Sequence, residues 1–492
     1  MPRYKIFPAI GIARLGEDQD FFLGPEIPGG GPTEAATGAP VTRFKNAGKT
    51  RLRKQGARFH LFESEDGVTW TPANLPPSAT VEWSVTLENK KSAIVRPPNP
   101  PIKSTRPALD AAAAGMHIKG GTKSVAGASA IGPTLDGMFK TTANGSAFEV
   151  PVELGSLRTD ANGMLIVLGG NGISGAPPGT PIGGSYYRNP KWYDDVSDGP
   201  VTAKISIGAG DAPVYAEGGA WVVVAPPDYA PGIGGIVTLY DVIRQVGIDQ
   251  LGLAPPAAVP SFDLDILPLI QRARRYRWVQ DEATWQDPSF EDPKLRSRSI
   301  SDQPLRATVQ ALILKAEKLL EGHTDPAGPK FEIRQAQESN LAAWVAGNFD
   351  DTPTSHGPTP TANGLTRAAL EGAVGQGFCP GIEAGIIVLD TTLYTSPFDF
   401  RIDQSTVAAG DLTALMAQPW QADFLKCNTN WWPSQRPDTA FQDHDNYKNW
   451  VRGASKHSLL VERFPRLGFI VQDGANEVFL EAERDPAMPN TP

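Results

Sequence analysis

A carboxylate and a thiol lie one helical turn apart near the C-terminus. Asp423 precedes Cys427 by four positions, and Cys427 is one of only two cysteines in the chain. Residues four apart share one face of a helix, so the two side chains could address one point if this stretch is helical. Four of the eleven tryptophans fall in the same segment, residues 415–452. Such a cluster of reactive and aromatic groups is unusual for an ordinary core.

The pair of Asp423 and Cys427 allows two interpretations. In the first, a buried cysteine lies beside an aspartate that caps a helix or forms a salt bridge. In the second, an aromatic and partly dry pocket turns the carboxylate into a proton acceptor near neutral pH, because desolvation raises the pKa of a carboxyl group. A hydrolase is disfavoured, since no histidine is paired with the thiol to form the thiolate. The nearby tryptophans suggest another option, a cofactor built from side chains.

The other cysteine, Cys379, lies in the segment FCPGIE, residues 378–383, beside a proline–glycine turn. Two cysteines do not make a disulfide framework, although one bridge between Cys379 and Cys427 is compatible with the sequence. Two buried free thiols are the simpler interpretation. A redox pair of the same two cysteines is a third hypothesis, from a different functional class.

Three other patterns indicate structure more than chemistry. Residues 170–175 spell GxGxxG after an apolar run, but the prolines that follow forbid the helix a dinucleotide site needs. We therefore expect a glycine-rich turn. Residues 192–200 form an acidic stretch, for which a loop whose aspartates cap its own turns is favoured over a loop that contacts a ligand. The six histidines are scattered without metal-ligand spacing, and His444, between Asp443 and Asp445, is expected in a solvated turn.

The hydrophobic period changes along the chain, which predicts an α+β fold. Up to residue 235, short runs alternate apolar and polar residues as half-buried strands do. Beyond that point, apolar residues recur at three- and four-residue steps, which indicates helices around 236–248, 305–322, 331–348, 365–374, 410–427 and 440–452. Short strands are expected at 383–390 and 467–474, and a linker or ordered excursion at 96–146. We predict a β-rich domain, 1–235, and a more helical domain, 236–492, that carries the active site.

Composition limits the partners. The chain has 492 residues, a net charge of −9 and no basic block, which argues against nucleic acid or an anionic membrane surface. It contains no apolar run of about 18 residues, so no membrane span is expected. The N-terminus does not have the pattern of a secretory signal, and the cytoplasm is the default compartment, with unconventional export as the alternative. The 50 glycines and 46 prolines indicate a turn-rich globular protein.

Several motifs, taken in order, resemble one family. The segments are KIFPAIGIARLGED near the N-terminus, NPKWYDDVSDGPV at 189–201, the PGIE motif at 380–383, and PWQAD at 419–423 with the cysteine four residues after its aspartate. Because these motifs follow one another in the order expected for that family, the chain resembles the LodA-like quinoproteins, the lysine ε-oxidase and glycine oxidase group. The resemblance extends from residue 6 to about residue 453.

The resemblance implies a cysteine tryptophylquinone cofactor, in which a cysteine sulfur is joined to a tryptophan oxidised to an ortho-quinone. Carried over to this chain, the cysteine is Cys427 and the catalytic base is Asp423. Trp450, in the segment NWVRG, is the better match to the modified tryptophan, and Trp432 is the alternative. Cys379 falls where the family places a substrate-pocket residue.

The implied activity is oxidative deamination of an amino acid or primary amine. The quinone takes the electrons of the substrate, Asp423 removes the α-proton, and O₂ reoxidises the cofactor to give H₂O₂ and ammonia. The resemblance further implies a flavoprotein maturation partner and a homo-oligomer, with no metal. The competing hypothesis is a non-catalytic relative that lacks the crosslink and acts as a binding or structural protein. The sequence does not indicate which amine would be the substrate.

Overall fold

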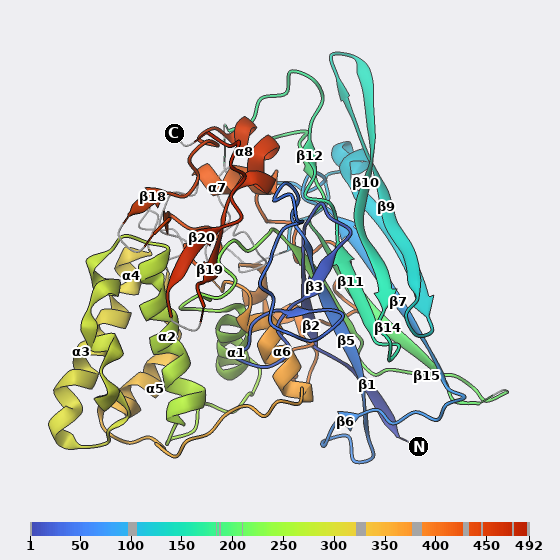
Figure 1. Cartoon of the computed structure of the whole chain (residues 1–492). Coiled ribbons are helices and arrows are strands. Elements are labelled where there is room, and N and C mark those ends of the chain that lie inside the picture. The colour runs from blue at the N-terminus through green and yellow to red at the C-terminus, as the bar shows by residue number, and fades with distance from the viewer. Residues whose placement is uncertain are drawn as a thin grey trace.

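The computed structural model describes residues 2–96, 106–183, 185, 188–208, 210–320, 331–375, 386–426, 432–443, 446–474 and 477–489. In this part of the chain a large twisted sheet lies beside a group of helices (Figure 1). The sheet comes from the N-terminal half, and the α-helices begin after residue 238. The predicted α+β architecture is confirmed. The division into domains 1–235 and 236–492 stays a prediction.

The described strands of the main sheet follow the order β8-β7-β14-β16-β2-β5-β11-β10-β9. Neighbours are antiparallel except β2 and β16, which run parallel. The two end strands also approach each other, because a Cβ added at Gly137 of β9 would lie 2.6 Å from a methyl group of Ile118 in β8. The sheet is therefore nearly closed. The bounds are β2 Ile10–Arg14, β5 Lys54–Ser64, β7 Thr80–Asn89, β8 Ile118–Ala126, β9 Ile131–Ala143, β10 Ser146–Thr159, β11 Leu165–Gly169, β14 Ser197–Ser206 and β16 Ala220–Ala225.

The alternation of the sequence explains which strand faces are buried. In β7, Trp83, Val85 and Leu87 are fully buried, while the residues between them are more exposed. The strands β11 and β16 are buried along their whole length, as their continuous apolar sequences require. Short strands border the sheet: β1 Arg3–Phe7, β3 Phe21–Leu23, β4 Thr33–Glu34, β6 Thr71–Pro72 and β15 Val214–Tyr215.

The helices cover one side of this sheet. Helix α6 packs on β2, and α1 packs on α6. The start of α1 is fixed by a capping box, in which Thr238 and Asp241 exchange side-chain and backbone hydrogen bonds. No helix among the described residues is long and apolar enough to cross a membrane. The bounds are α1 Leu239–Gln250, α2 Leu267–Arg275, α3 Gln303–Leu314, α4 Ala316–Leu319, α5 Gln335–Val345 and α6 Ala362–Glu371.

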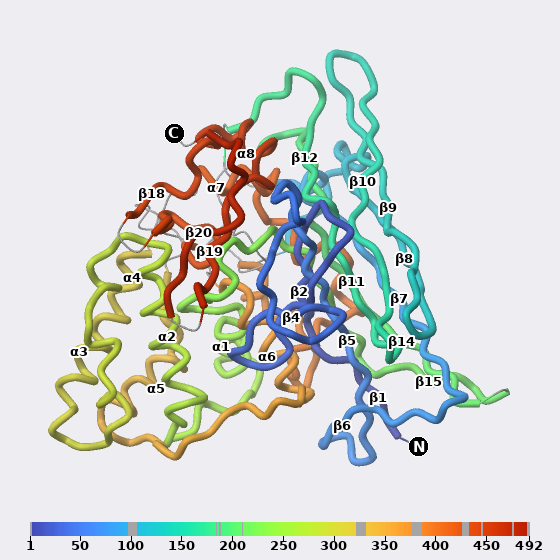
Figure 2. The backbone as a smooth tube through the Cα atoms, viewed as in Figure 1, coloured from blue at the N-terminus to red at the C-terminus, as the bar shows by residue number. Residues whose placement is uncertain are grey.

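The C-terminal segment lies between the helices and the N-terminal strands (Figure 2). Phe469 stacks on Phe44 with ring centroids 5.1 Å apart, and Arg275 of α2 lies over the ring of Phe479. This segment therefore joins the two structural layers. Its elements are α7 Asp423–Lys426, β17 Thr439–Phe441, β18 Tyr447–Asn449, α8 His457–Arg463, β19 Phe469–Gln472 and β20 Phe479–Ala482.

Three helix or strand predictions in the C-terminal third are wrong. The helix expected at 440–452 is the hairpin of β17 and β18. The helix expected at 410–427 is reduced to turns and α7, and prolines at 419 and 433 bracket this short helix. The strand expected at 383–390 contains the 3₁₀ turn Ile387–Leu389 in its described part. The strand predicted at 467–474 is confirmed as β19.

Two loops expected in the N-terminal half are strands. The excursion at 96–146 contains β8 and β9, whose glycines and exposed polar residues weaken the alternation. The acidic stretch at 192–200 forms β13 (Tyr193–Asp194) and the beginning of β14, and its aspartates are buried instead of solvated. The glycine-rich turn at 170–175 is confirmed, because β11 ends there and β12 (Ser174–Gly175) pairs with β13.

Candidate active site

Asp423 is the first residue of α7 and is completely buried. A 3₁₀ turn, Trp420–Ala422, leads directly into this helix. The backbone N–H of Trp420 donates a 2.8 Å hydrogen bond to Oδ2 of Asp194. This bond satisfies one of the donors that the start of a helix leaves unpaired. The carboxylate predicted to act as a base thus lies in the interior, on a short helix that a second carboxylate holds in place.

Asp194 itself belongs to a buried polar network. Its carboxylate pairs with the ammonium group of Lys91, and both side chains are 1% exposed. Asn89 donates to Oδ1 of Asp194 at 3.0 Å. A buried charge pair is strongly destabilised when one partner is removed, since the other charge is left uncompensated. The acidic stretch that the sequence predicted to be a loop therefore anchors the segment that carries Asp423.

An aromatic cluster connects α7 to Trp450. Phe424, the residue after Asp423, lies 5.2 Å from Trp420 and 6.4 Å from Trp450 between ring centroids. Tyr229 packs edge-on against Trp450 at 4.8 Å and donates its hydroxyl to the carbonyl of Phe464 at 2.8 Å. Burial raises the pKa of Tyr229 well above its ordinary value. The structure brings together two of the predicted site residues, Asp423 and Trp450, in one dry neighbourhood.

Trp450 follows β18 directly and is fully buried. Its indole Nε1 donates to the carbonyl of Gly468 at 2.8 Å, and its backbone N–H donates to the carbonyl of Asp438 at 3.2 Å. The guanidinium of Arg484 donates to the backbone carbonyl of Trp450. The indole N–H, the backbone N–H and the backbone carbonyl of Trp450 therefore all have hydrogen-bond partners, which hold the residue in one position.

Trp432, the alternative tryptophan, is also buried but is held by a different group of contacts. The backbone N–H groups of Gln435 and Arg436 donate to its carbonyl. The guanidinium carbon of Arg436 lies 5.8 Å from its ring centroid, and Arg436 also donates to the carbonyl of Asp423 at 2.7 Å. Trp432 therefore borders α7 through Arg436, whereas Trp450 borders it through Phe424.

Three sequence-predicted positions lie outside the described residues: Cys427, Cys379 and His444. Cys427 is the residue that follows the last position of α7 in the sequence. Within the described part of the chain, no group of three histidine, cysteine, aspartate or glutamate residues is placed to hold a metal ion.

A buried lysine next to the cluster was not found from the sequence. Lys45 is fully buried, and its ammonium group donates to the carbonyl of Leu467, the residue before the Gly468 that receives the indole of Trp450. Burial lowers the pKa of Lys45 to about 7. Burial likewise raises the pKa of Glu17, whose charge interacts with Lys45, to about 7. Lys45 stands in no recognisable motif, and Glu17 lies near the end of a motif whose sequence does not indicate its burial, so only the fold reveals this pair.

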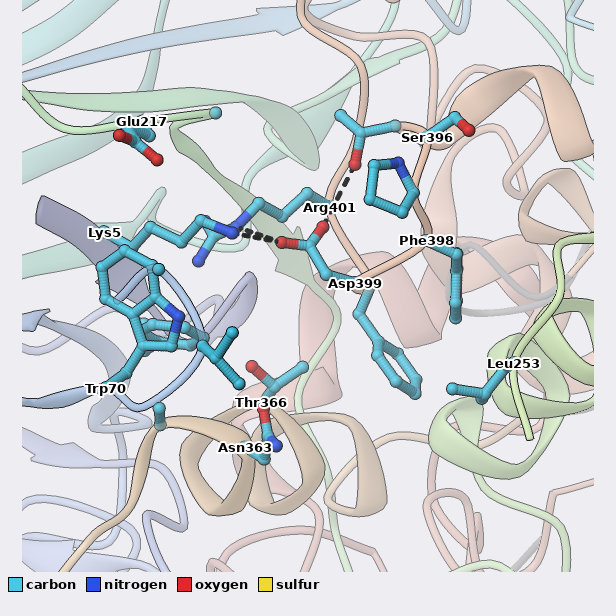
Figure 3. Close-up of a pocket in the computed structure, with 18 of the residues that line it drawn as sticks. Lys5, Trp70, Glu217, Leu253, Asn363, Thr366, Ser396, Phe398, Asp399 and Arg401 are labelled. Carbon is cyan, nitrogen blue, oxygen red and sulfur yellow. Dashed lines mark hydrogen bonds and ion pairs between the residues drawn. The ribbon is translucent and has the colours of Figure 1, made fainter. Parts of the chain in front are cut away.

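A large cavity lies away from this site. It has a volume of about 1020 Å³ and lies among β1, α1, α6 and the loop around Asp399 (Figure 3). Its charged groups are largely paired with one another, because Asp399 accepts from both Lys5 and Arg401. It shares no lining residue with the aromatic cluster around Trp450.

A smaller cavity of about 280 Å³ does border the cluster. Asp228, Ser434 and Gln435 line it, together with Arg14 and glycine-rich turns. Tyr229, next to Asp228, donates its backbone N–H to the carbonyl of Gln435 at 2.9 Å. Two lining residues, Asp228 and Gln435, are thus joined through the main chain to the residue whose ring packs on Trp450.

Comparison with known proteins gives one consistent result. Residues 7–224 match the model of the L-lysine ε-oxidase N-terminal domain, and residues 330–450 match the model of the L-lysine ε-oxidase C-terminal domain. L-lysine 6-oxidase of Marinomonas mediterranea is 28% identical over an alignment of 529 residues, which covers 86% of this chain and 71% of the relative.

Solved structures agree on the fold. The Schiff-base intermediate of L-Lys ε-oxidase from Marinomonas mediterranea with L-Lys superposes with a TM-score of 0.77 at 23% identity, covering 98% of this chain and 95% of that one. A second crystal structure of the L-Lys ε-oxidase from Marinomonas mediterranea gives a TM-score of 0.76 at 22% identity, with the same coverage. The two family models and the relative together cover most of the motifs that we singled out. The chain therefore belongs to the L-lysine ε-oxidase, or LodA-like, family.

Proposed function

We propose that the protein is an amino-acid oxidase whose cofactor is a cysteine tryptophylquinone formed from Cys427 and Trp450. Its relative L-lysine 6-oxidase is an amino-acid oxidase by name, and this supports the class of reaction. The observation that carries the proposal is structural: the helix that begins at Asp423 packs through Phe424 against Trp450 in one buried aromatic cluster.

The residues around Trp450 fit such a group. Cys427 directly follows α7 in the sequence, and Phe424 in this short helix packs on Trp450. An ortho-quinone at this position supplies an electron sink for the electron pair of the substrate C–H bond. Trp432 remains the alternative partner of Cys427.

The surrounding side chains have separate tasks in this proposal. Asp423 accepts the proton from the carbon that bears the reacting amine. Tyr229 and Phe424 exclude water from the face of Trp450, while Gly468 and Arg484 hold it by hydrogen bonds. The overall reaction balances as primary amine, O₂ and water giving aldehyde or keto acid, ammonia and H₂O₂. A flavoprotein that matures the cofactor and a homo-oligomeric assembly belong to the same proposal.

Tryptic mapping of the protein from its own host tests the proposal and identifies the tryptophan. Trypsin cleaves after Lys426, Lys448 and Arg452, and Pro437 protects the bond after Arg436. Cys427 and Trp432 therefore share the peptide 427–448, whereas Trp450 lies in the peptide 449–452. If Trp450 is modified, the two peptides elute as one crosslinked species with two added oxygens. If Trp432 is modified, the crosslink is internal to 427–448.

Unmodified peptides would contradict the proposal and favour the alternative, a non-catalytic relative. The same digest also tests the redox-pair hypothesis, since a bond between Cys379 and Cys427 disappears on reduction with a thiol, whereas a thioether does not. Production of H₂O₂ from a panel of amino acids then tests the activity of the crosslinked protein.

A further inference from the structure

We propose that the glycine-rich turn at 170–175 positions the proposed base Asp423, and that Ser174 and Gln421 are the residues through which it acts. This inference rests on the proposed oxidase function and adds two positioning residues to it. In the sequence the turn stood out only for its likeness to a dinucleotide site. In the structure it lies at the same end of the molecule as α7 and contacts the segment that leads into this helix (Figure 1).

The turn binds both polar atoms of the Gln421 side chain. Ser174 donates its hydroxyl to Oε1 of Gln421 at 2.7 Å. Nε2 of Gln421 donates to the carbonyl of Gly172 at 3.3 Å. Because Gln421 is completely buried, these two bonds satisfy groups that bulk water does not reach. Gln421 lies in the 3₁₀ turn that precedes α7, so the glycine-rich turn holds the chain two residues before Asp423.

A second strand holds the neighbouring residue of the same 3₁₀ turn. Ser174 of β12 and Asp194 of β13 are register partners in an antiparallel pair. Directly opposed residues present their side chains on one face of a sheet. Asp194 accepts the backbone N–H of Trp420, the residue before Gln421. The two strands, here called the β12–β13 clamp, therefore hold two consecutive residues of the 3₁₀ turn.

The glycine spacing follows from the contacts of this clamp. A Cβ at Gly170 would lie 2.6 Å from Oδ2 of the buried Asp195, and a Cβ at Gly175 would lie 2.7 Å from the hydroxyl of Tyr193. Both distances are shorter than real Cβ contacts. Gly172, between them, has a φ of +77°, a conformation that favours glycine. Close packing and one left-handed backbone position thus explain the pattern GxGxxG without a nucleotide.

The clamp acts on Asp423 through the main chain. The backbone N–H of Asp423 donates to the carbonyl of Gln421, so the direction in which α7 starts depends on where Gln421 is held. The helix α7, Asp423–Lys426, has a single turn, and a helix of that length is not stable by itself. A displacement of about 1 Å in a reacting group can cost roughly 100-fold in rate. The clamp therefore contributes to catalysis by fixing the carboxylate toward the C–H bond that it deprotonates.

Hydrogen–deuterium exchange in the full-length protein tests the clamp without turnover. Ser174→Ala removes the hydroxyl that binds Gln421, and the backbone amides of residues 420–423 should exchange roughly 2- to 10-fold faster, as loss of one neutral hydrogen bond predicts. Ser174→Thr keeps a hydroxyl and should exchange like wild type. Ser84→Ala is the matched control, because it removes a serine hydroxyl bonded to Ser124 at 2.8 Å in β7 and β8, outside the clamp. It should leave the exchange of residues 420–423 unchanged.

Kinetics of the crosslinked variants show whether the clamp serves the base. Ser174→Ala should lower kcat by roughly 10- to 100-fold and leave KM within about twofold of wild type, because Ser174 orients Asp423 and does not hold the substrate. Deuteration of the substrate at the reacting carbon should slow Ser174→Ala more than wild type, since proton removal then limits turnover. Ser174→Thr should restore kcat and the isotope effect.

Each other outcome decides the question. Fast exchange of residues 420–423 in the wild-type protein overturns the inference, even if Ser174→Ala fails to fold. Unchanged exchange in a folded Ser174→Ala variant overturns it, and so does wild-type kcat in its crosslinked form. A raised KM at unchanged kcat would assign Ser174 to substrate binding, and equal losses in Ser174→Thr would show that the hydroxyl is not the cause; both reject the inference. Failure of the oxidase proposal is separate, because it appears as unmodified tryptic peptides while exchange is still measured.

Discussion

Asp423 is the residue on which the proposed chemistry depends most. Asp423→Asn keeps the shape of the side chain but removes the proton acceptor. We expect kcat to fall by roughly 10²- to 10⁴-fold, the range that general base catalysis contributes. Stopped-flow or steady-state release of H₂O₂ measures this loss. Tryptic mapping of the variant is the control, since a crosslinked peptide shows that the loss is catalytic and not a failure of cofactor formation. A variant that carries the crosslink and keeps wild-type kcat would exclude Asp423 as the base.

The buried pair of Lys91 and Asp194 should contribute strongly to the stability of the protein. Lys91→Met leaves the Asp194 carboxylate without its cation, and we expect the free energy of unfolding to fall by about 3–5 kcal/mol. Lys204→Met is the matched control, because Lys204 pairs with Glu82 on the surface, where such pairs contribute about 0–1 kcal/mol. Denaturant titration of both variants checks the difference. Equal losses would mean that the buried pair does not anchor the segment of Asp423.

At the level of residues, only part of the candidate site could be predicted from the sequence. The spacing of Asp423 and Cys427 was visible in the sequence, because a helical turn has a fixed length. The neighbourhood of Trp450 was not, since Tyr229, Phe464 and Lys45 come from distant segments without a motif. Their contribution arises from the packing of the C-terminal segment against the sheet, which no local pattern encodes.

At the scale of elements, the turn after β11 approaches the site closely. Gly172 has a φ of +77°, and a Cβ there would lie 2.6 Å from Cζ of Phe464, whose ring packs on Trp420. Gly172→Ala therefore combines backbone strain with a steric clash, and we expect a loss of about 2–4 kcal/mol in the free energy of unfolding.

Gly145→Ala separates the two causes of that loss. Gly145 has a φ of +78° in the β9–β10 turn, but nothing lies within 4 Å of its Cβ position. It should lose only the strain of about 1–2 kcal/mol. Thermal or chemical unfolding of both variants gives the comparison, and equal losses would show that Phe464 moves aside freely.

The helices and strands that were predicted well from the sequence are those in which apolar residues recur at a regular spacing. The helices α1, α3, α5 and α6 and the strand β7 follow their apolar spacing closely. The errors at 410–427 and 440–452 have a physical cause, because prolines and densely packed aromatic side chains override local helical spacing there. In β13 and β14, Asp194 and Asp198 have partners from other segments, so charge did not mark exposure. The backbone N–H of Thr413, for example, donates to Asp198 at 2.8 Å.

At the scale of the whole molecule, buried carboxyl groups predict how stability depends on pH. Burial raises the pKa of Asp195 to about 7 and that of Asp198 to about 6. The folded state then binds more protons than the unfolded state between the ordinary value of 3.8 and these values. The stabilisation they contribute is fully present below about pH 4 and is lost as the pH rises through 6 and 7.

Asp195→Asn should remove the Asp195 part of this dependence. Oδ2 of Asp195 accepts the backbone N–H of Ile173 at 3.1 Å, and an amide oxygen can do the same. We expect the variant to gain stability relative to wild type between pH 5 and pH 8 by at least about 1 kcal/mol. Unfolding curves at both pH values measure the gain. A constant difference between variant and wild type would show that Asp195 does not titrate in this range.

The walls of the 280 Å³ cavity next to Asp228 have a consequence for how this scaffold can diversify. Part of the wall is bare main chain, because Gly31 lines the cavity with nothing within 4 Å of its Cβ position and without a positive φ. A larger side chain can be accommodated at this position without strain or repacking. One substitution there would reduce the volume of the cavity, while the sheet and the surroundings of Trp450 stay as they are. Cavity volume and structural integrity are thus set by separate residues, so selection can change one without sacrificing the other.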